Sequence, residues 1–114
     1  MTTFKDQYEV VGLTRHGSAD HNELKADITQ KEQAAGSILK IAPHVVVHAA
    51  AETNVDRCET ERDHAEKVNV MGTANVAESC AKIGAKLIFV STDYVFDGAK
   101  GDYAETDEPN PVNF

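Results

Sequence analysis

The sequence predicts an α/β fold in which helices flank a parallel sheet. Short apolar runs rich in β-branched residues alternate with longer segments of helical periodicity. Two of these runs, Val45–Val47 and Leu87–Val90, are almost wholly apolar, which is typical of parallel strands buried on both faces. The second run is followed by polar side chains, Ser91–Tyr94, at the strand end where open α/β sheets bind ligands. The order strand, strand, helix, strand, helix, strand then indicates a Rossmann-type arrangement with right-handed crossovers.

Composition limits the function classes. At 114 residues the chain is at most one small domain, and the net charge of −8 argues against a nucleic-acid partner. Cys58 and Cys80 lack Cys-x-x-Cys spacing, which indicates reduced thiols in a cytoplasmic protein. We expect no metal site, because the histidines are scattered, and no membrane span, because no apolar run approaches about 18 residues.

The predicted first strand is flanked by polar segments on both sides. Thr2–Gln7 is similar to the end of a helix, and Tyr8–Leu13 is predicted to be a strand. The turn that follows, Thr14–Ser18, carries an arginine and a histidine. Such a turn at the carboxyl edge of a strand holds an anion or is an ordinary solvated loop.

The next segment predicts an edge strand and a helix. Leu24–Ile28 is the expected strand, and Thr29 with Glu32 has the spacing of a capping box that opens the helix. Pro43 should end this helix. Its expected apolar face is formed by Ala34, Ala35, Ile38, Leu39 and Ile41.

The strand Val45–Val47 delivers His48 and then three very small residues, Ala49, Ala50 and Ala51. Their small side chains leave room for a flat ligand against the backbone. Close packing of a helix on the sheet explains them equally well.

A short helical turn is predicted at Val55–Glu59 and a long helix at Glu61–Lys82, capped by Gly84. Asn69 falls on the apolar face of this helix, where an unpaired amide would cost about 1–3 kcal/mol, so it is a functional residue or a structural bridge. Ala99–Phe114 is expected to be a surface loop. The expected apolar face of the long helix comprises Ala65, Asn69, Gly72, Val76, Cys80 and Ile83.

Several ordered segments resemble the dTDP-4-dehydrorhamnose reductase family of the extended short-chain dehydrogenases/reductases. They are Val45–Ala51, Val55–Glu59, Val68–Val70, Ser91–Gly98 and Glu105–Pro111. The resemblance runs from about Tyr8 to Phe114 and implies a partial NAD(P)-binding domain over residues 1–114. It also implies reduction of a 4-keto sugar nucleotide with NADPH or NADH in dTDP-rhamnose biosynthesis, in the cytoplasm, by a protein able to form a homodimer.

The same resemblance implies roles for the residues after the last strand and for Asn69. Thr92 would donate a hydrogen bond to the keto oxygen of the substrate, and Asn69 would support the network behind the catalytic lysine of the family. Ser91 would lie beside Thr92, on the cofactor side. The substrate-binding residues would be Thr92, Asp93, Tyr94, Val95 and Phe96.

The cofactor residues follow in the same way. Asp27 and Ile28 would flank the adenine, and Ala49, Ala50 and Ala51 would pass under the ribose and pyrophosphate. Thr14 and Arg15 would meet the adenosine 2′-phosphate, which favours NADPH, since NADH is held by a carboxylate on the 2′-hydroxyl.

The chain departs from the family pattern in ways that predict a central fragment, inactive by itself. The glycine-rich phosphate loop and its strand are expected ahead of Thr2, and the catalytic Tyr-x-x-x-Lys pair after Phe114. The absent strand would lie between Tyr8–Leu13 and the strand ending at His48, so these two should share no hydrogen-bond ladder.

Glu52 stands where many relatives of the family carry an aromatic residue. The run Ala50-Ala51-Glu52 is similar to the non-catalytic regulatory subunit of methionine adenosyltransferase. The alternative function is therefore NADP binding and regulation of a partner enzyme, without reduction.

Overall fold

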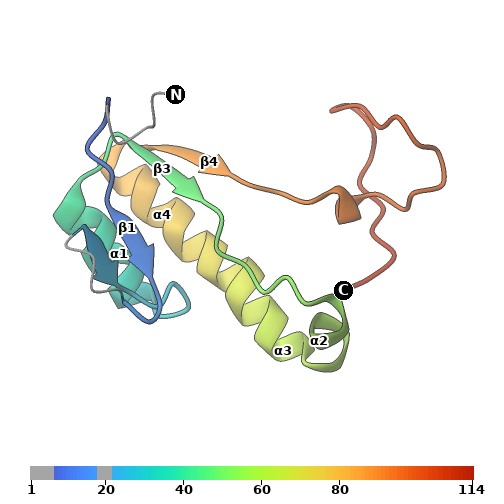
Figure 1. The fold of residues 1–114 in the computed structure, drawn as a ribbon, viewed down its shortest axis with the longest axis horizontal. Helices are drawn as coiled ribbons and strands as arrows, with labels where there is room; N and C mark the ends of the chain where they lie inside the picture. The colour runs from blue at the N-terminus through green and yellow to red at the C-terminus, as the bar shows by residue number, and fades with distance from the viewer. Residues whose placement is uncertain (1–6, 18–21) are drawn as a thin grey trace.

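A computed structural model describes residues 7–17 and 22–114 of the chain (Figure 1). The predicted helix end at Thr2–Asp6 and the turn residue Ser18 lie outside the described residues. The strands are β1 (Gly12–Thr14), β2 (Glu23–Lys25), β3 (Val45–His48) and β4 (Lys86–Phe89). The helices are α1 (Lys31–Ile41), α2 (Val55–Thr60), α3 (Arg62–Ala65), a π-helix (Glu66–Gly72), α4 (Thr73–Ile83) and a 3₁₀ turn (Asp93–Val95).

The strands form two parallel pairs, β1 with β2 and β3 with β4. Among the described residues no ladder joins the two pairs. Parallel strands linked through helices confirm the predicted α/β class. The sequence also predicted that β1 and β3 would share no hydrogen-bond ladder, and none joins them among the described residues. Helix α4 lies along β3 and β4, whereas α3 extends beyond the strands and the chain after β4 stands apart from them (Figure 1).

The first two strands are shorter than the predicted Tyr8–Leu13 and Leu24–Ile28. Their pairing closes where the amide of Ala26 donates to the carbonyl of Thr14, at 2.9 Å. After Ala26 the backbone turns away, because the amide of Asp27 donates to Oε1 of Gln33 instead of to a strand, at 3.0 Å. A side-chain acceptor from helix α1 has replaced the ladder.

The predicted capping box at the start of α1 is wrong. Both the amide and the hydroxyl of Thr29 donate to Oδ1 of Asp27, at 2.9 and 2.8 Å. The hydroxyl of Thr29 therefore bonds Asp27, which precedes it in the chain, and not the first turn of the helix. The helix begins after Gln30 with no side-chain cap. The end of the helix is as predicted, because Ala42 adopts a left-handed conformation just before Pro43.

The long predicted helix is continuous from α3 to α4 and ends at Gly84, whose φ of 70° is the expected left-handed cap. Four members of the expected stripe are buried: Ala65, Gly72, Val76 and Cys80. Its middle is a π-helix, which the sequence did not indicate. Such widened turns are frequent at functional sites.

The core lies on one side of the strand pairs, where Ile38 of α1 packs with Val76 and Cys80 of α4. Partly buried apolar side chains from both pairs pack against it, including Leu13 of β1 and Leu87 of β4. No helix among the described residues is both long and apolar enough to cross a bilayer.

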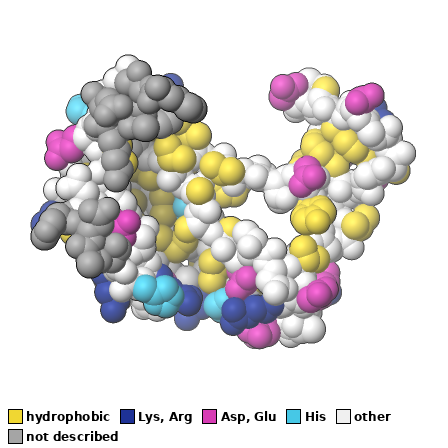
Figure 2. Space-filling model, in the orientation of Figure 1, with side chains coloured by type: hydrophobic (Ala, Val, Ile, Leu, Met, Phe, Trp, Pro, Cys, Tyr) yellow, Lys and Arg dark blue, Asp and Glu magenta, His cyan; other side chains and the backbone are white. Residues whose placement is uncertain are grey.

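The prediction that β3 and β4 are buried on both faces is wrong. Val47 is 64% exposed, and Ile88 and Phe89 are about half exposed. Helices of the described chain cover only the core side of these strands. Hydrophobic side chains therefore line the hollow in the middle of the other face (Figure 2). Leu39, expected on the apolar face of α1, is also exposed.

Adjacent residues of α1 test where the core lies. Replacing Ile38, which is 1% exposed, with alanine should lower the free energy of unfolding by about 2–5 kcal/mol, through lost burial and a cavity. Leu39→Ala removes the same number of carbon atoms from a side chain that is 47% exposed, and should cost much less. Urea unfolding monitored by circular dichroism measures both, and equal losses would contradict this placement of the core.

Candidate functional site

A pocket of about 250 Å³ opens where the carboxyl ends of β1, β2 and β3 face one another. It brings together predicted cofactor residues that are far apart in the sequence: Arg15, Asp27, Ile28, Ala50 and Ala51. The remaining lining residues are Leu13, His16, Ala26, Thr29, Glu52, His64 and Val68.

Three residues predicted for the cofactor are not among those that line this pocket: Thr14, Ala49 and Ser91. The hydroxyl of Thr14 accepts a hydrogen bond from the amide of Gly17 at 2.9 Å, so it shapes the turn that carries Arg15. Ala49 and Ser91 are exposed at the ends of β3 and β4.

The carboxylate of Asp27 is engaged inside its own turn. The hydroxyl and the amide of Thr29 both donate to it and lower its pKa, with smaller contributions from the positive charges of Arg15 and Lys67. The acidic group of the pocket is therefore already hydrogen-bonded, whereas no described side chain forms an ion pair with the guanidinium of Arg15.

Asn69, on the π-helix, holds the turn after the alanines. Its Oδ1 accepts from the amide of Glu52 at 2.8 Å, and its Nδ2 donates to the carbonyl of Glu52 at 3.1 Å. The thiol of Cys58 lies 3.6 Å from the same carbonyl. Asn69 thus forms the structural bridge that the sequence left as an alternative, and its role near a catalytic lysine stays a prediction.

The carboxylate of Glu52 lies in the pocket wall and is 16% exposed. It accepts from the amide of Asn54 at 3.1 Å, and this bond is the main cause of its lowered pKa. Arg57 lies 3.1 Å away and His64 3.5 Å away, and both lower the pKa further. The negative charge is therefore balanced at the surface of the pocket.

Two lining residues on the long helix, His64 and Val68, were not predicted from the sequence. They are four positions apart, so they lie on one face of the helix. Adjacent helical positions do not share a face, so the predicted apolar stripe through Asn69 gave no signal for either residue.

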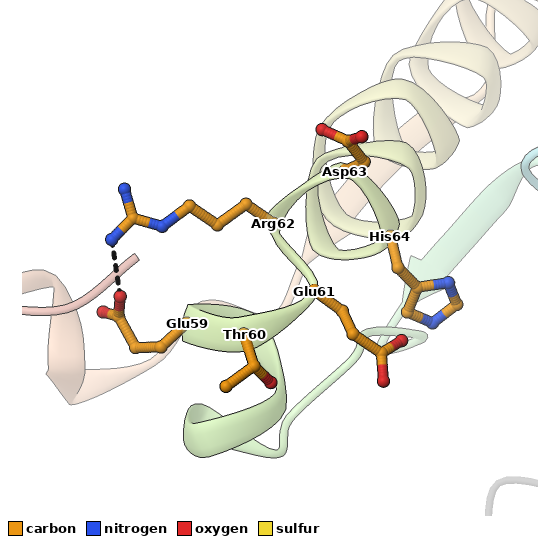
Figure 3. A pocket seen from close by; sticks show the side chains of 6 residues that line it. All are labelled: Glu59, Thr60, Glu61, Arg62, Asp63 and His64. Carbon is orange, nitrogen blue, oxygen red and sulfur yellow. Dashed lines mark hydrogen bonds and ion pairs between the residues drawn. The ribbon is translucent and has the colours of Figure 1, made fainter.

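A second hollow, of about 440 Å³, lies outside the turn between α2 and α3 and is lined by Glu59–His64 (Figure 3). Arg62 pairs with Glu59 at 2.6 Å and lies over the ring of Phe114, 4.9 Å from its centroid. In Figure 3 the side chains of Glu59 and Arg62 point away from His64. The hollow is an open part of the surface, where Arg62 packs against Phe114. It does not resemble a ligand site.

The predicted substrate residues Thr92–Phe96 do not join the pocket. Thr92 caps the 3₁₀ turn, because its hydroxyl accepts from the amide of Tyr94 at 3.2 Å. The same hydroxyl makes a long contact of 3.3 Å with the carboxylate of Asp93. Thr92, Asp93 and Tyr94 are exposed, and the chain around them stands apart from β1 and β2 (Figure 1).

The loop that follows is folded around Asp97. Its carboxylate accepts from the hydroxyl of Tyr103, from the amide of Ala99 at 2.9 Å and from Nδ2 of Asn110 at 2.9 Å. These bonds, that of Tyr103 first, lower the pKa of Asp97 to about 2. The ring of Tyr103 stacks on Phe96 with centroids 4.3 Å apart. The loop therefore presents Phe96, a predicted substrate residue, in a fixed position.

His48 is buried at the end of β3, and its Nε2 lies 3.0 Å from the hydroxyl of Thr73 on α4. Burial lowers the pKa of His48, which favours the neutral ring. Within residues 7–17 and 22–114, no group of three or more His, Cys, Asp or Glu side chains is placed to hold a metal ion.

Comparisons with known proteins agree with the resemblance read from the sequence. The sequence model of one family, described as the RmlD substrate binding domain, matches residues 2–114. The dTDP-4-dehydrorhamnose reductase of Aggregatibacter actinomycetemcomitans is 42% identical over 107 residues, which are 93% of this chain and 34% of that protein. Methionine adenosyltransferase 2 subunit beta of Bos taurus is 49% identical over 76 residues, 67% of this chain and 23% of that protein.

The fold agrees as well. The crystal structure of dTDP-4-dehydrorhamnose reductase from Bacillus anthracis in complex with NADP superposes with a TM-score of 0.76 and 41% identity, over 80% of this chain and 34% of that one. The chain thus spans about a third or less of the length of these relatives.

The low pKa of Asp97 predicts how its loop responds to acid. Because the folded value of about 2 lies below the ordinary 3.8, the carboxylate stabilises the loop fully above pH 4, and this stabilisation is lost as the pH falls toward 2. The NMR shifts of the Tyr103 ring, stacked on Phe96, should therefore move over this range. Asp97→Asn should remove the transition, whereas Asp102→Asn, at an exposed position of the same loop, should keep it. An unchanged Tyr103 titration in Asp97→Asn would contradict this.

Proposed function

The chain belongs to the RmlD substrate binding domain family, and from this premise we propose that the whole protein uses NADPH to reduce a 4-keto deoxysugar nucleotide. The whole protein is the product of the complete reading frame that carries these residues. The observation that carries the proposal is the pocket in which Arg15, Asp27, Ile28, Ala50 and Ala51 meet. These residues come from three strand ends, where open α/β sheets bind their ligands.

The pocket suits the adenosine end of a dinucleotide. Its volume of about 250 Å³ is below the roughly 300–1,000 Å³ of sites that hold a complete drug-sized ligand. Ile28 and Val68 supply apolar surface for a flat purine, and Ala50 and Ala51 let a ligand approach the backbone. One end of the cofactor would therefore occupy this pocket, with residues 1–114 forming part of the NAD(P)-binding domain.

Charge supports NADPH over NADH. A 2′-phosphate needs a cation, which Arg15 supplies, and bidentate guanidinium contacts to phosphate are strong. A free 2′-hydroxyl needs a carboxylate acceptor, and Oδ1 of Asp27 already accepts two hydrogen bonds from Thr29, which leaves Oδ2 as the oxygen that could serve. The relative from Bacillus anthracis was crystallised with NADP.

The reduction needs a donor at the keto oxygen. The bound nicotinamide would supply hydride, and the hydroxyl of Thr92 would donate to the oxygen on which negative charge develops. Its contact with Asp93 is long, at 3.3 Å, so it can be exchanged for a substrate at small cost. Tyr94, Val95 and Phe96 would form the sugar wall, with Phe96 held by its stack on Tyr103.

A second function is favoured by one observation. The bovine methionine adenosyltransferase subunit is 49% identical over its matched segment, and Glu52 follows Ala50 and Ala51 as this alternative predicts. The whole protein would then bind NADP and a partner enzyme and reduce nothing. NADPH binding without oxidation in the presence of dTDP-4-keto sugars would favour it. The homodimer and the cytoplasmic location stay predictions from the sequence.

Cofactor preference tests the role of Arg15. In the whole protein, Arg15→Ala should raise the KM for NADPH by about 10- to 150-fold, since a charge-assisted contact is worth about 1.5–3 kcal/mol, and leave the KM for NADH nearly unchanged. Arg62→Ala is the control, because Arg62 lies on the outer surface beside Glu59 (Figure 3). Equal effects of Arg15→Ala on both cofactors would exclude Arg15 from the 2′-phosphate site.

Turnover tests the role of Thr92. Thr92→Val, which keeps the shape but removes the donor, should lower kcat by about 100-fold or more with little change in NADPH affinity. Thr92→Ser should recover much of the activity. Steady-state kinetics with a dTDP-4-keto sugar measures both, and full activity of the valine variant would mean that another group donates to the oxygen.

A further inference from the structure

The pocket wall formed by Ile28 is held from behind by helix α4. Nδ2 of Asn75 donates to the carbonyl of Ile28 at 2.9 Å, across 47 positions of the sequence. The bond is partly buried, so water competes for it less than on an open surface. It fixes the backbone at the point where the chain has left β2 and enters the pocket.

Gly72, at the end of the π-helix, holds the side chain of the same residue. A Cβ at Gly72 would lie 2.9 Å from both Cγ1 and Cδ1 of Ile28, closer than real contacts allow. The φ of Gly72 is −60°, an ordinary helical value, so glycine is needed here for space. Ile28 therefore packs directly against the backbone of the helix.

The contacts of Asn75 and Gly72 with Ile28 determine where one wall of the pocket lies. One wall, with Ile28, follows β2, and the other, with Ala50 and Ala51, follows β3. Helix α4 contacts both sides, since Thr73 bonds His48 at the end of β3 and Asn75 bonds Ile28. The helix therefore ties the Ile28 wall to the end of β3.

We propose that Gly72 and Asn75 are positioning residues that hold Ile28 in its place in the pocket wall and thereby set the affinity of the pocket for an adenosine phosphate. This inference rests on the proposed function, because the adenosine end of NADPH is the ligand that the pocket would hold. Neither residue needs to touch the ligand. Each acts through Ile28.

The experiment measures binding of adenosine 2′,5′-bisphosphate to the whole protein by calorimetry, with the unfolding midpoint of each variant recorded alongside. Asn75→Ala should weaken binding by about 5- to 10-fold, the equivalent of one hydrogen bond that orders the site. Asn22→Ala is the matched control: its amide also donates to a backbone carbonyl, that of Val10, which does not line the pocket. It should change the affinity by less than about twofold.

Gly72 is tested by a double-mutant cycle with Ile28. Gly72→Ala should weaken binding, whereas in the Ile28→Ala background, which lacks the clashing Cγ1 and Cδ1, it should have no further effect. Gly36→Ala is the control, because an added Cβ there meets nothing within 4 Å. If Asn75→Ala does not fold, Asn75→Ser replaces it in the same measurement.

The outcomes separate this inference from the function on which it rests. Unchanged affinity in Asn75→Ala and Gly72→Ala, even with lowered unfolding midpoints, would overturn the positioning role and leave the function standing. Additive effects of Gly72→Ala and Ile28→Ala would also overturn it. No binding by the unsubstituted protein would overturn the proposed NADPH site itself, and the inference with it.

Discussion

Helix α4 packs against both strand pairs of the described residues and bonds the ends of two strands. Its buried side chains pack with α1 and with apolar residues of both pairs, and this burial supplies most of the stabilisation without fixing a direction. Direction comes from the first turn of the helix, where Thr73 bonds His48 and Asn75 bonds Ile28. Each such bond contributes only about 0.5–1.5 kcal/mol to stability, yet it ties the helix to a strand end at a defined point.

The pocket at these strand ends has a local charge pattern that differs from that of the chain as a whole. With a net charge of −8, the chain as a whole repels phosphate. Locally, Thr29 donates two hydrogen bonds to Oδ1 of Asp27, while the amide of Asn54 and the guanidinium of Arg57 stabilise the carboxylate of Glu52. Arg15 remains as a positive group that no described carboxylate neutralises through an ion pair. In the proposed site, the local arrangement of hydrogen bonds rather than the overall charge would determine which ligand binds.

The two halves of the candidate site differ in how they are built. The loop around Asp97 is held by partners close in sequence, such as Tyr103 and Asn110, and it keeps its shape apart from the strands. The pocket depends on distant partners, as the bonds of Asn69 to Glu52 and of Asn75 to Ile28 show. A change in the packing of the long helix would therefore alter the pocket while leaving the loop intact.

The sequence by itself determined the α/β class, the end of the long helix at Gly84, most of its buried stripe and a set of strand-end residues that meet in one pocket. The first three features follow from periodicity and backbone conformation, which act over a few residues, whereas the set of pocket residues was implied by the family resemblance. Only the tertiary structure decided that Thr29 bonds Asp27 rather than Glu32, that the helix widens at Asn69, and that one face of β3 and β4 is exposed. In each case the local sequence allowed more than one arrangement of a polar side chain or an apolar face. The choice between them depends on which distant segment packs against it, and that information is not local.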